Sequence, residues 1–181
     1  MHGTETPSPW IQRWSHLIPP DSNVLDLACG AGRHMQHLAG LGHQVLGVDR
    51  SEAALASASA WGTTLQADIE NGPWPLAGRA FGAVVVTNYL WRALWPQILA
   101  SLQNQGVLLY ETFAQGHETV GRPSRPDFLL APGELLQVAA QGGLRVVAYE
   151  DGFMPSPERF VQRLAAVREV PGSSPSRHRL P

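Results

Sequence analysis

The chain has 181 residues, 44% of them hydrophobic, and a formal net charge of −2. This length suits a single domain with a sizeable core, and so small a charge offers no broad basic surface for a nucleic acid. No apolar run is long enough to cross a bilayer, and the first residues lack the pattern of a signal peptide, so we expect a cytoplasmic protein that acts on a small molecule. Cys29 is the one cysteine and lysine is absent, which excludes an internal disulfide and lysine-based catalysis.

Residues 9–17 carry apolar side chains at helical spacing and are followed by two prolines, which predicts a short N-terminal helix. A strand, a glycine turn, a helix and a second strand then follow in residues 24–49. Gly30 and Gly32 lack a Cβ, so the backbone there can turn sharply and approach a ligand closely. Asp49 closes the second strand 19 positions after Gly30, where a carboxylate meets the two hydroxyl groups of a ribose.

The helix after the turn is predicted over residues 33–41, with Leu38 and Leu41 facing inward. His34 and His37 stand three positions apart on it, a spacing that suits two metal ligands on one face. No acidic or cysteine partner accompanies them, so we predict no metal site and interpret the two histidines as solvated or close to the cofactor. Ser51 is expected to cap the next helix, over residues 52–60.

The residues around the turn discriminate between two cofactor classes. A dinucleotide site needs a third glycine to make room for the pyrophosphate, and Met35 stands at that position. Asp26, just before the turn, would repel a pyrophosphate but attract the ammonium group of an amino acid. S-adenosylmethionine carries such an ammonium group and no phosphate.

The motif Asp26-Leu27-Ala28-Cys29-Gly30-Ala31-Gly32 resembles the first motif of the class I S-adenosylmethionine-dependent methyltransferases. The family usually has glycine where Ala28 stands, and we expect that an alanine does not take the same backbone angles. The resemblance implies that S-adenosylmethionine is the cofactor and that Asp68 accepts a hydrogen bond from the adenine amino group. The N-terminal helix either covers the cofactor, as in the family, or only packs its two tryptophans, Trp10 and Trp14, on the sheet. The cofactor-binding residues predicted in this way are Asp26, Ala28, Gly30, Gly32, Asp49, Arg50, Asp68, Ile69 and Asn88.

Two further strands are predicted over residues 63–67 and 81–87, and the second is apolar enough to lie in the middle of the sheet. In the resembled fold the end of that strand faces the methyl group. Asn88, Tyr89, Trp91 and Arg92 are therefore candidates for the site of the methyl acceptor. Tyr89 is expected to position the acceptor, because a phenol with an ordinary pKa near 10 is a poor base.

After a helix over residues 93–102 and a strand over 107–110, residues 111–132 show no clear periodicity. A structureless segment of this length is usually functional, and we interpret it as a lid. Within it, residues 121–130 are similar to a segment of the tellurite-resistance-like methyltransferases. Arg122 and Arg125 either clamp an anionic acceptor or pair with acidic neighbours, and His117 is either the near-neutral base or an exposed histidine without a role.

The chain ends with a helix over residues 133–141 and two strands, over 144–150 and 160–168, with a turn predicted around Asp151-Gly152 and 155–157. This pair resembles the antiparallel strands that close a methyltransferase sheet. The predicted fold is a doubly wound, seven-stranded, mostly parallel α/β sheet with an antiparallel terminal pair, Rossmann-like, over residues 1–170. Residues 171–181 are predicted to be a disordered tail.

The predicted function is methyl transfer from S-adenosylmethionine to a small-molecule acceptor, in which anions are one option. No catalytic base is identified, and neither a nucleic acid nor a membrane is an expected partner. Two alternatives stay open at this stage. One is a nicotinamide-dependent oxidoreductase, against which Asp26, Met35 and the terminal strand pair argue. The other is a non-catalytic subunit that binds S-adenosylmethionine for a partner.

Overall fold

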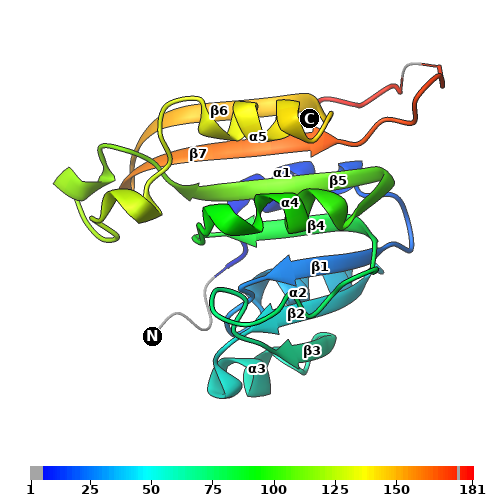
Figure 1. Cartoon of the computed structure of the whole chain (residues 1–181), viewed down its shortest axis with the longest axis horizontal. Helices are drawn as coiled ribbons and strands as arrows, with labels where there is room; N and C mark the ends of the chain where they lie inside the picture. Colours follow the sequence, from blue (N-terminus) through cyan, green and yellow to red (C-terminus); the bar gives the residue numbers. More distant parts are fainter. Residues whose placement is uncertain (1–5, 175) are drawn as a thin grey trace.

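The computed structural model describes residues 6–174 and 176–181, which form a seven-stranded sheet in the order β3-β2-β1-β4-β5-β7-β6 (Figure 1). Strands β1 to β5 are parallel, and β7 is antiparallel to both of its neighbours. The predicted fold is therefore confirmed. The strands are β1 (Asn23–Leu27), β2 (Gln44–Asp49), β3 (Thr63–Gln66), β4 (Phe81–Thr87), β5 (Leu102–Phe113), β6 (Arg145–Pro155) and β7 (Glu158–Val167).

Helices cover both faces of the sheet, and side chains alternate between the faces as extended backbone requires. The α-helices are α1 (Pro9–Trp14), α2 (Arg33–Gly40), α3 (Glu52–Ala58), α4 (Trp95–Ala100) and α5 (Glu134–Gln141), and the 3₁₀ helices are η1 (Ser15–Leu17), η2 (Arg92–Leu94), η3 (His117–Thr119) and η4 (Pro126–Phe128). On β1, for example, Val24 belongs to the hydrophobic cluster that contains residues of α1, α2 and α3, whereas Leu25 belongs to the cluster that contains residues of α4 and α5. No helix in the described part of the chain has the length and apolarity to cross a bilayer.

The structure corrects the prediction at several ends of elements. Helix α2 stops at Gly40, so Leu41, which was expected to face inward, is 52% exposed. Asp151 and Gly152 lie inside the ladder between β6 and β7 and are not part of a turn. Strand β5 continues to Phe113, beyond the predicted end, and pairs with β7 along that extension.

The segment between β5 and α5 leaves the sheet and returns to it. Ala114 and Leu130 form an isolated bridge, and the Gln115 amide donates to the Leu130 carbonyl at 2.9 Å. Gly116 lies directly against the ring of Phe160 on β7, where an added Cβ would stand 2.9 Å from a ring carbon. We refer to residues 114–130 as the bridged loop, because its two ends meet at the carboxyl edge of the sheet.

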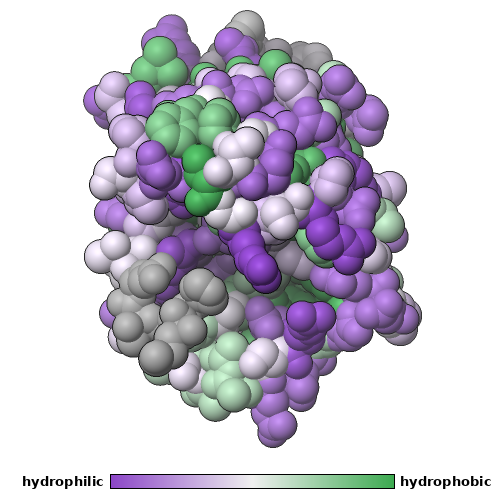
Figure 2. All heavy atoms as spheres, turned by 90° about the vertical axis from the view of Figure 1, so that its left-hand side faces the viewer, coloured by the Kyte–Doolittle hydropathy of each residue, from purple (hydrophilic) through white to green (hydrophobic). Residues whose placement is uncertain are grey.

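The carboxyl ends of the parallel strands all lie on the left-hand side of Figure 1, the side that faces the viewer in Figure 2. Hydrophilic side chains predominate on this face, although the strands beneath it are apolar. In a doubly wound sheet, this edge is where ligands bind.

Candidate functional site

The turn after β1 is held in place by the carboxylate that ends β2. The Gly30 amide donates to Asp49 Oδ2, and the Ser51 amide donates to Asp49 Oδ1, both at 2.9 Å. Each carboxylate oxygen has a second lone pair, so Asp49 can still accept hydrogen bonds from a ligand. The sequence predicted its ligand-facing role but not its second role, which is to hold the backbone of the turn.

Three residues of the turn adopt left-handed backbone angles. Ala28 has φ +57°, Gly30 +55° and Gly32 +84°, so the expectation that alanine does not take a glycine-like conformation at position 28 is wrong. A Cβ on Gly30 would meet no atom within 4 Å, which leaves open space in front of the turn. A Cβ on Gly32 would stand 2.9 Å from Ala58 of α3, so that glycine is required by helix packing.

Asp26 lies on β1, beneath the turn, and is only 1% exposed. Burial raises the pKa of its carboxyl group from 3.8 to about 7, although Arg33 counteracts the rise. Its Oδ2 atom makes no hydrogen bond with the described residues. The carboxyl group of Asp26 is therefore partly protonated at neutral pH. Its predicted role beside an ammonium group had assumed a carboxylate that is always ionised.

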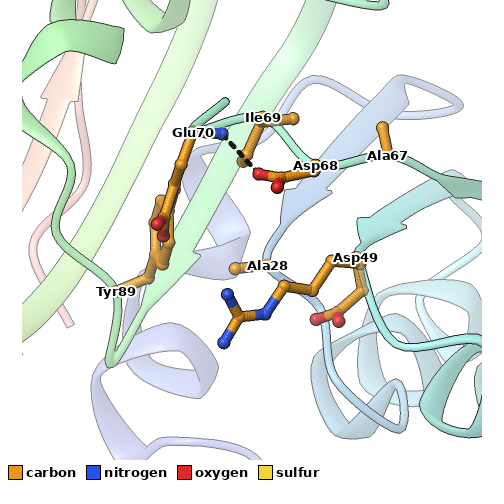
Figure 3. A pocket seen from close by; sticks show the side chains of 8 residues that line it. Ala28, Asp49, Ala67, Asp68, Ile69, Glu70 and Tyr89 are labelled. Carbon is orange, nitrogen blue, oxygen red and sulfur yellow. Dashed lines mark hydrogen bonds between the residues drawn. The ribbon is translucent and has the colours of Figure 1, made fainter. Parts of the chain in front are cut away.

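A first cavity of about 190 Å³ lies between the ends of β2, β3 and β4 (Figure 3). Asp49 borders it on one side, and Tyr89 and Glu70 stand on the opposite side. Asp68 accepts hydrogen bonds from Asn71 Nδ2 at 2.9 Å and from the Glu70 amide at 3.0 Å, and these bonds lower its pKa. The other lining residues are Ala28, Arg50, Ala67 and Ile69. Two carboxylates facing an aromatic ring match the hydroxyl groups and the base of a nucleoside.

Two further cavities continue from the first. The second, of about 380 Å³, shares Ala28 with the first and extends to Gly30, His34, Thr87 and Arg122. The third, of about 260 Å³, shares Tyr89 and Glu70 with the first, and its lining includes three aromatic residues, Tyr89, Phe113 and Phe128. Asn88 borders both the second and the third cavity, so the three spaces meet at the end of β4.

Solved structures of known methyltransferases have the same fold. TehB from Haemophilus influenzae is 20% identical with a TM-score of 0.70, and the match covers 86% of this chain but only 60% of TehB. A Mesorhizobium loti S-adenosylmethionine-dependent methyltransferase is 17% identical, with a TM-score of 0.69 and 89% and 99% of the two chains covered. A TehB-like methyltransferase from Corynebacterium glutamicum is 19% identical, with a TM-score of 0.63 and 88% and 87% covered.

Residues 24–106, which contain the glycine turn and the whole first cavity, match the model of a methyltransferase domain family. This stretch is a methyltransferase domain, similar to those of the class I S-adenosylmethionine-dependent methyltransferases. The predicted family and cofactor are therefore confirmed, and the narrower resemblance to the tellurite-resistance-like group is matched by the fold of TehB. No curated protein sequence matches the chain.

The candidate acceptor residues do not all reach the cavities. Arg122 lines the second cavity. Arg125 is exposed and pairs with Asp127 at 2.7 Å, which is the alternative role that the sequence left open. Arg92 binds Glu134 at 2.6 Å and also donates to the carbonyl oxygens of residues 127 and 129, so it fastens the bridged loop to α5.

His117 is buried, with 4% of its surface exposed, so its interpretation as an exposed loop residue is wrong. Its ring stacks on Phe113, with 4.3 Å between the centroids, and its Nε2 atom lies 3.0 Å from the Arg122 carbonyl. His117 thus supports two residues that line the second cavity. His34 is also buried and is not solvated, whereas His37 binds the Ser15 hydroxyl at 3.0 Å.

The sequence analysis did not predict a buried polar cluster of Glu111, Arg163 and Ser8 next to the cavities. Glu111 on β5 is 1% exposed, binds Arg163 Nε of β7 at 2.6 Å and accepts a hydrogen bond from the Ser8 hydroxyl at 3.1 Å. Thr87 of β4 is its register partner on the other side. The sequence signal that could have indicated this cluster is the position of Glu111 directly after the apolar residues 107–110. A charged side chain in a buried strand requires a partner.

Proposed function

We propose that the chain transfers a methyl group from S-adenosylmethionine to a small-molecule acceptor. The observation that carries this proposal is the Asp49 carboxylate, which holds the Gly30 turn and borders the first cavity opposite Tyr89. Asp49 would bind the ribose, and Asp68 and Ile69 the adenine. The amino-acid part would then extend past Ala28 and Gly30 into the second cavity, towards Asn88. Arg50 borders the first cavity, whereas Asp26 and Gly32 line none of the three cavities.

The proposed reaction requires no covalent bond between the protein and either ligand. The cofactor supplies a methyl group that its sulfonium has already activated. The residues of the chain need to bind both ligands, align them and exclude water. Tyr89 is suited to positioning and not to proton abstraction, because burial and the neighbouring Glu70 carboxylate raise its pKa.

The surroundings of Asn88 support two classes of acceptor. Arg122, in the lining of the second cavity, favours the anionic acceptor that the sequence suggested. The third cavity instead offers aromatic rings and the Glu70 carboxylate, a combination that suits an amine. We place anions first, and a screen that pairs oxyanions and carboxylates with amines of similar size discriminates between the two classes.

Calorimetry with S-adenosylmethionine and S-adenosylhomocysteine tests the cofactor site. Asp49→Ala should weaken both ligands at least 10-fold, because it removes the acceptor of the Gly30 amide and the ribose contact together. Glu52→Ala is the matched control, since Glu52 is an exposed acid in the first turn of α3 and does not border the first cavity. Binding of NADH in place of both sulfur ligands would contradict the proposal. Tight binding without turnover on any acceptor would favour the non-catalytic subunit.

The proposal also includes a lid over the site, the bounds of the domain and the cellular location. The bridged loop lies against the second and third cavities through Arg122, Pro123 and Phe128, which supports a role as a lid. Residues 1–170 are proposed as the catalytic domain and 171–181 as a tail. In the described part of that tail, the Arg179 carbonyl lies 2.8 Å from His16 Nε2. The cytoplasm stays the proposed location, on the argument from the sequence alone.

A further inference from the structure

A chain of hydrogen bonds connects the N-terminal segment to the end of β4. His34 of α2 is 1% exposed and lies between Ser8, which caps α1, and Thr87, the last residue of β4. Its Nε2 atom is 3.1 Å from the Ser8 amide nitrogen, and its Nδ1 atom is 3.3 Å from Thr87 Oγ1. His34 and Thr87 both line the second cavity.

The direction of each hydrogen bond follows from the Ser8 amide, which can only donate. His34 Nε2 must therefore accept. Burial, with a smaller contribution from Arg33, lowers the pKa of His34 to about 3, so the ring is neutral and carries a single proton. That proton resides on Nδ1 and is donated to Thr87 Oγ1. The hydrogen of the Thr87 hydroxyl then points away from His34 and is free for another acceptor.

We propose that His34 is a positioning residue, which orients the Thr87 hydroxyl as a hydrogen-bond donor to a carboxylate bound in the second cavity. This inference rests on the proposed function, because the carboxylate is that of the amino-acid part of the cofactor. The second cavity joins the nucleoside-shaped first cavity at Ala28, so a ligand held by Asp49 extends into it. The first cavity does not involve Thr87, which makes the two parts of the ligand separable in an experiment.

The test compares two ligands that differ in the amino-acid part. S-adenosylhomocysteine contains it, and 5′-methylthioadenosine has the same nucleoside and thioether sulfur without it. Thr87→Val removes the hydroxyl at nearly constant volume, and we expect S-adenosylhomocysteine to bind about 10- to 100-fold more weakly while 5′-methylthioadenosine changes less than about 2-fold. Thr87→Ser retains the hydroxyl and should bind both ligands within about 3-fold of the unaltered protein.

Equal losses for the two ligands would indicate a structural role for Thr87, and no loss would mean that the hydroxyl is not a ligand; either result overturns the inference. Nitrogen-15 NMR of the histidine-labelled protein gives an independent measurement. We expect the signal that disappears in His34→Gln to come from a neutral ring with a protonated Nδ1, and a protonated Nε2 in that ring contradicts the orientation. If the unaltered protein binds neither ligand, the proposed function fails first, and the inference fails with it.

Discussion

Asp26→Asn should make the protein more stable at neutral pH. The carboxyl group of Asp26 has a pKa of about 7 in the folded protein, compared with 3.8 without burial. Between these two values the folded state binds more protons than the unfolded state, so the free energy of unfolding falls as the pH rises. At about 1.36 kcal/mol per pKa unit, this loss amounts to about 4 kcal/mol. Asparagine does not ionise and avoids it.

Urea unfolding of both proteins at several pH values from 4 to 8 measures the effect. The difference in free energy of unfolding, Asp26→Asn minus unaltered protein, should increase by about 4 kcal/mol across this range and level off near pH 8. His34→Gln is the comparison, because the pKa of His34 is lowered from 6.5 to about 3 and its removal changes stability in the opposite direction over a similar pH range. A difference for Asp26→Asn that stays constant with pH would refute the reasoning.

Other predictions follow from single observations. Ala28→Gly should raise the free energy of unfolding by about 0.5–1 kcal/mol, because relief of the left-handed conformation exceeds the extra entropy of an unfolded glycine; a loss of stability contradicts this. Glu111→Ala should cost about 2–3 kcal/mol, because the buried Arg163 loses its closest carboxylate and keeps only Glu150 at 3.1 Å, whereas Arg125→Ala, at an exposed pair, should cost less than about 1 kcal/mol in the same urea titration. Tyr89→Phe should leave the shape of the pH profile of kcat unchanged, since its raised pKa excludes a role as the base; loss of one limb of the profile would disprove this.

The sheet was predictable because its signals are local. The apolar run at residues 81–87 has no polar face, and the structure buries all seven residues in β4. The glycine turn and Asp49 lie within one strand-helix-strand unit, so their spacing alone indicated their proximity. Element ends were less accurate, as Leu41 illustrates, because a helix end depends on backbone hydrogen bonds that hydrophobic spacing does not report.

The parts of the site that sequence analysis missed depend on contacts between distant segments. Glu111 and Arg163 meet only because β5 and β7 pair in one particular register. His117 is buried because β5 extends to Phe113 and the bridged loop folds back on it, which no pattern within residues 111–132 indicates. Likewise, the tautomer of His34 depends on Ser8, which lies 26 positions earlier in the chain.

The bridge between Ala114 and Leu130 gives the bridged loop the character of an exchangeable module. The two ends lie side by side on the sheet, so the length and sequence between them can change while the ends stay in place, and the entropic cost of a longer loop grows only slowly. The residues of the first cavity lie between positions 28 and 89, outside this module. Replacing the loop with that of a related enzyme should therefore change the lining of the second and third cavities while keeping the first cavity intact.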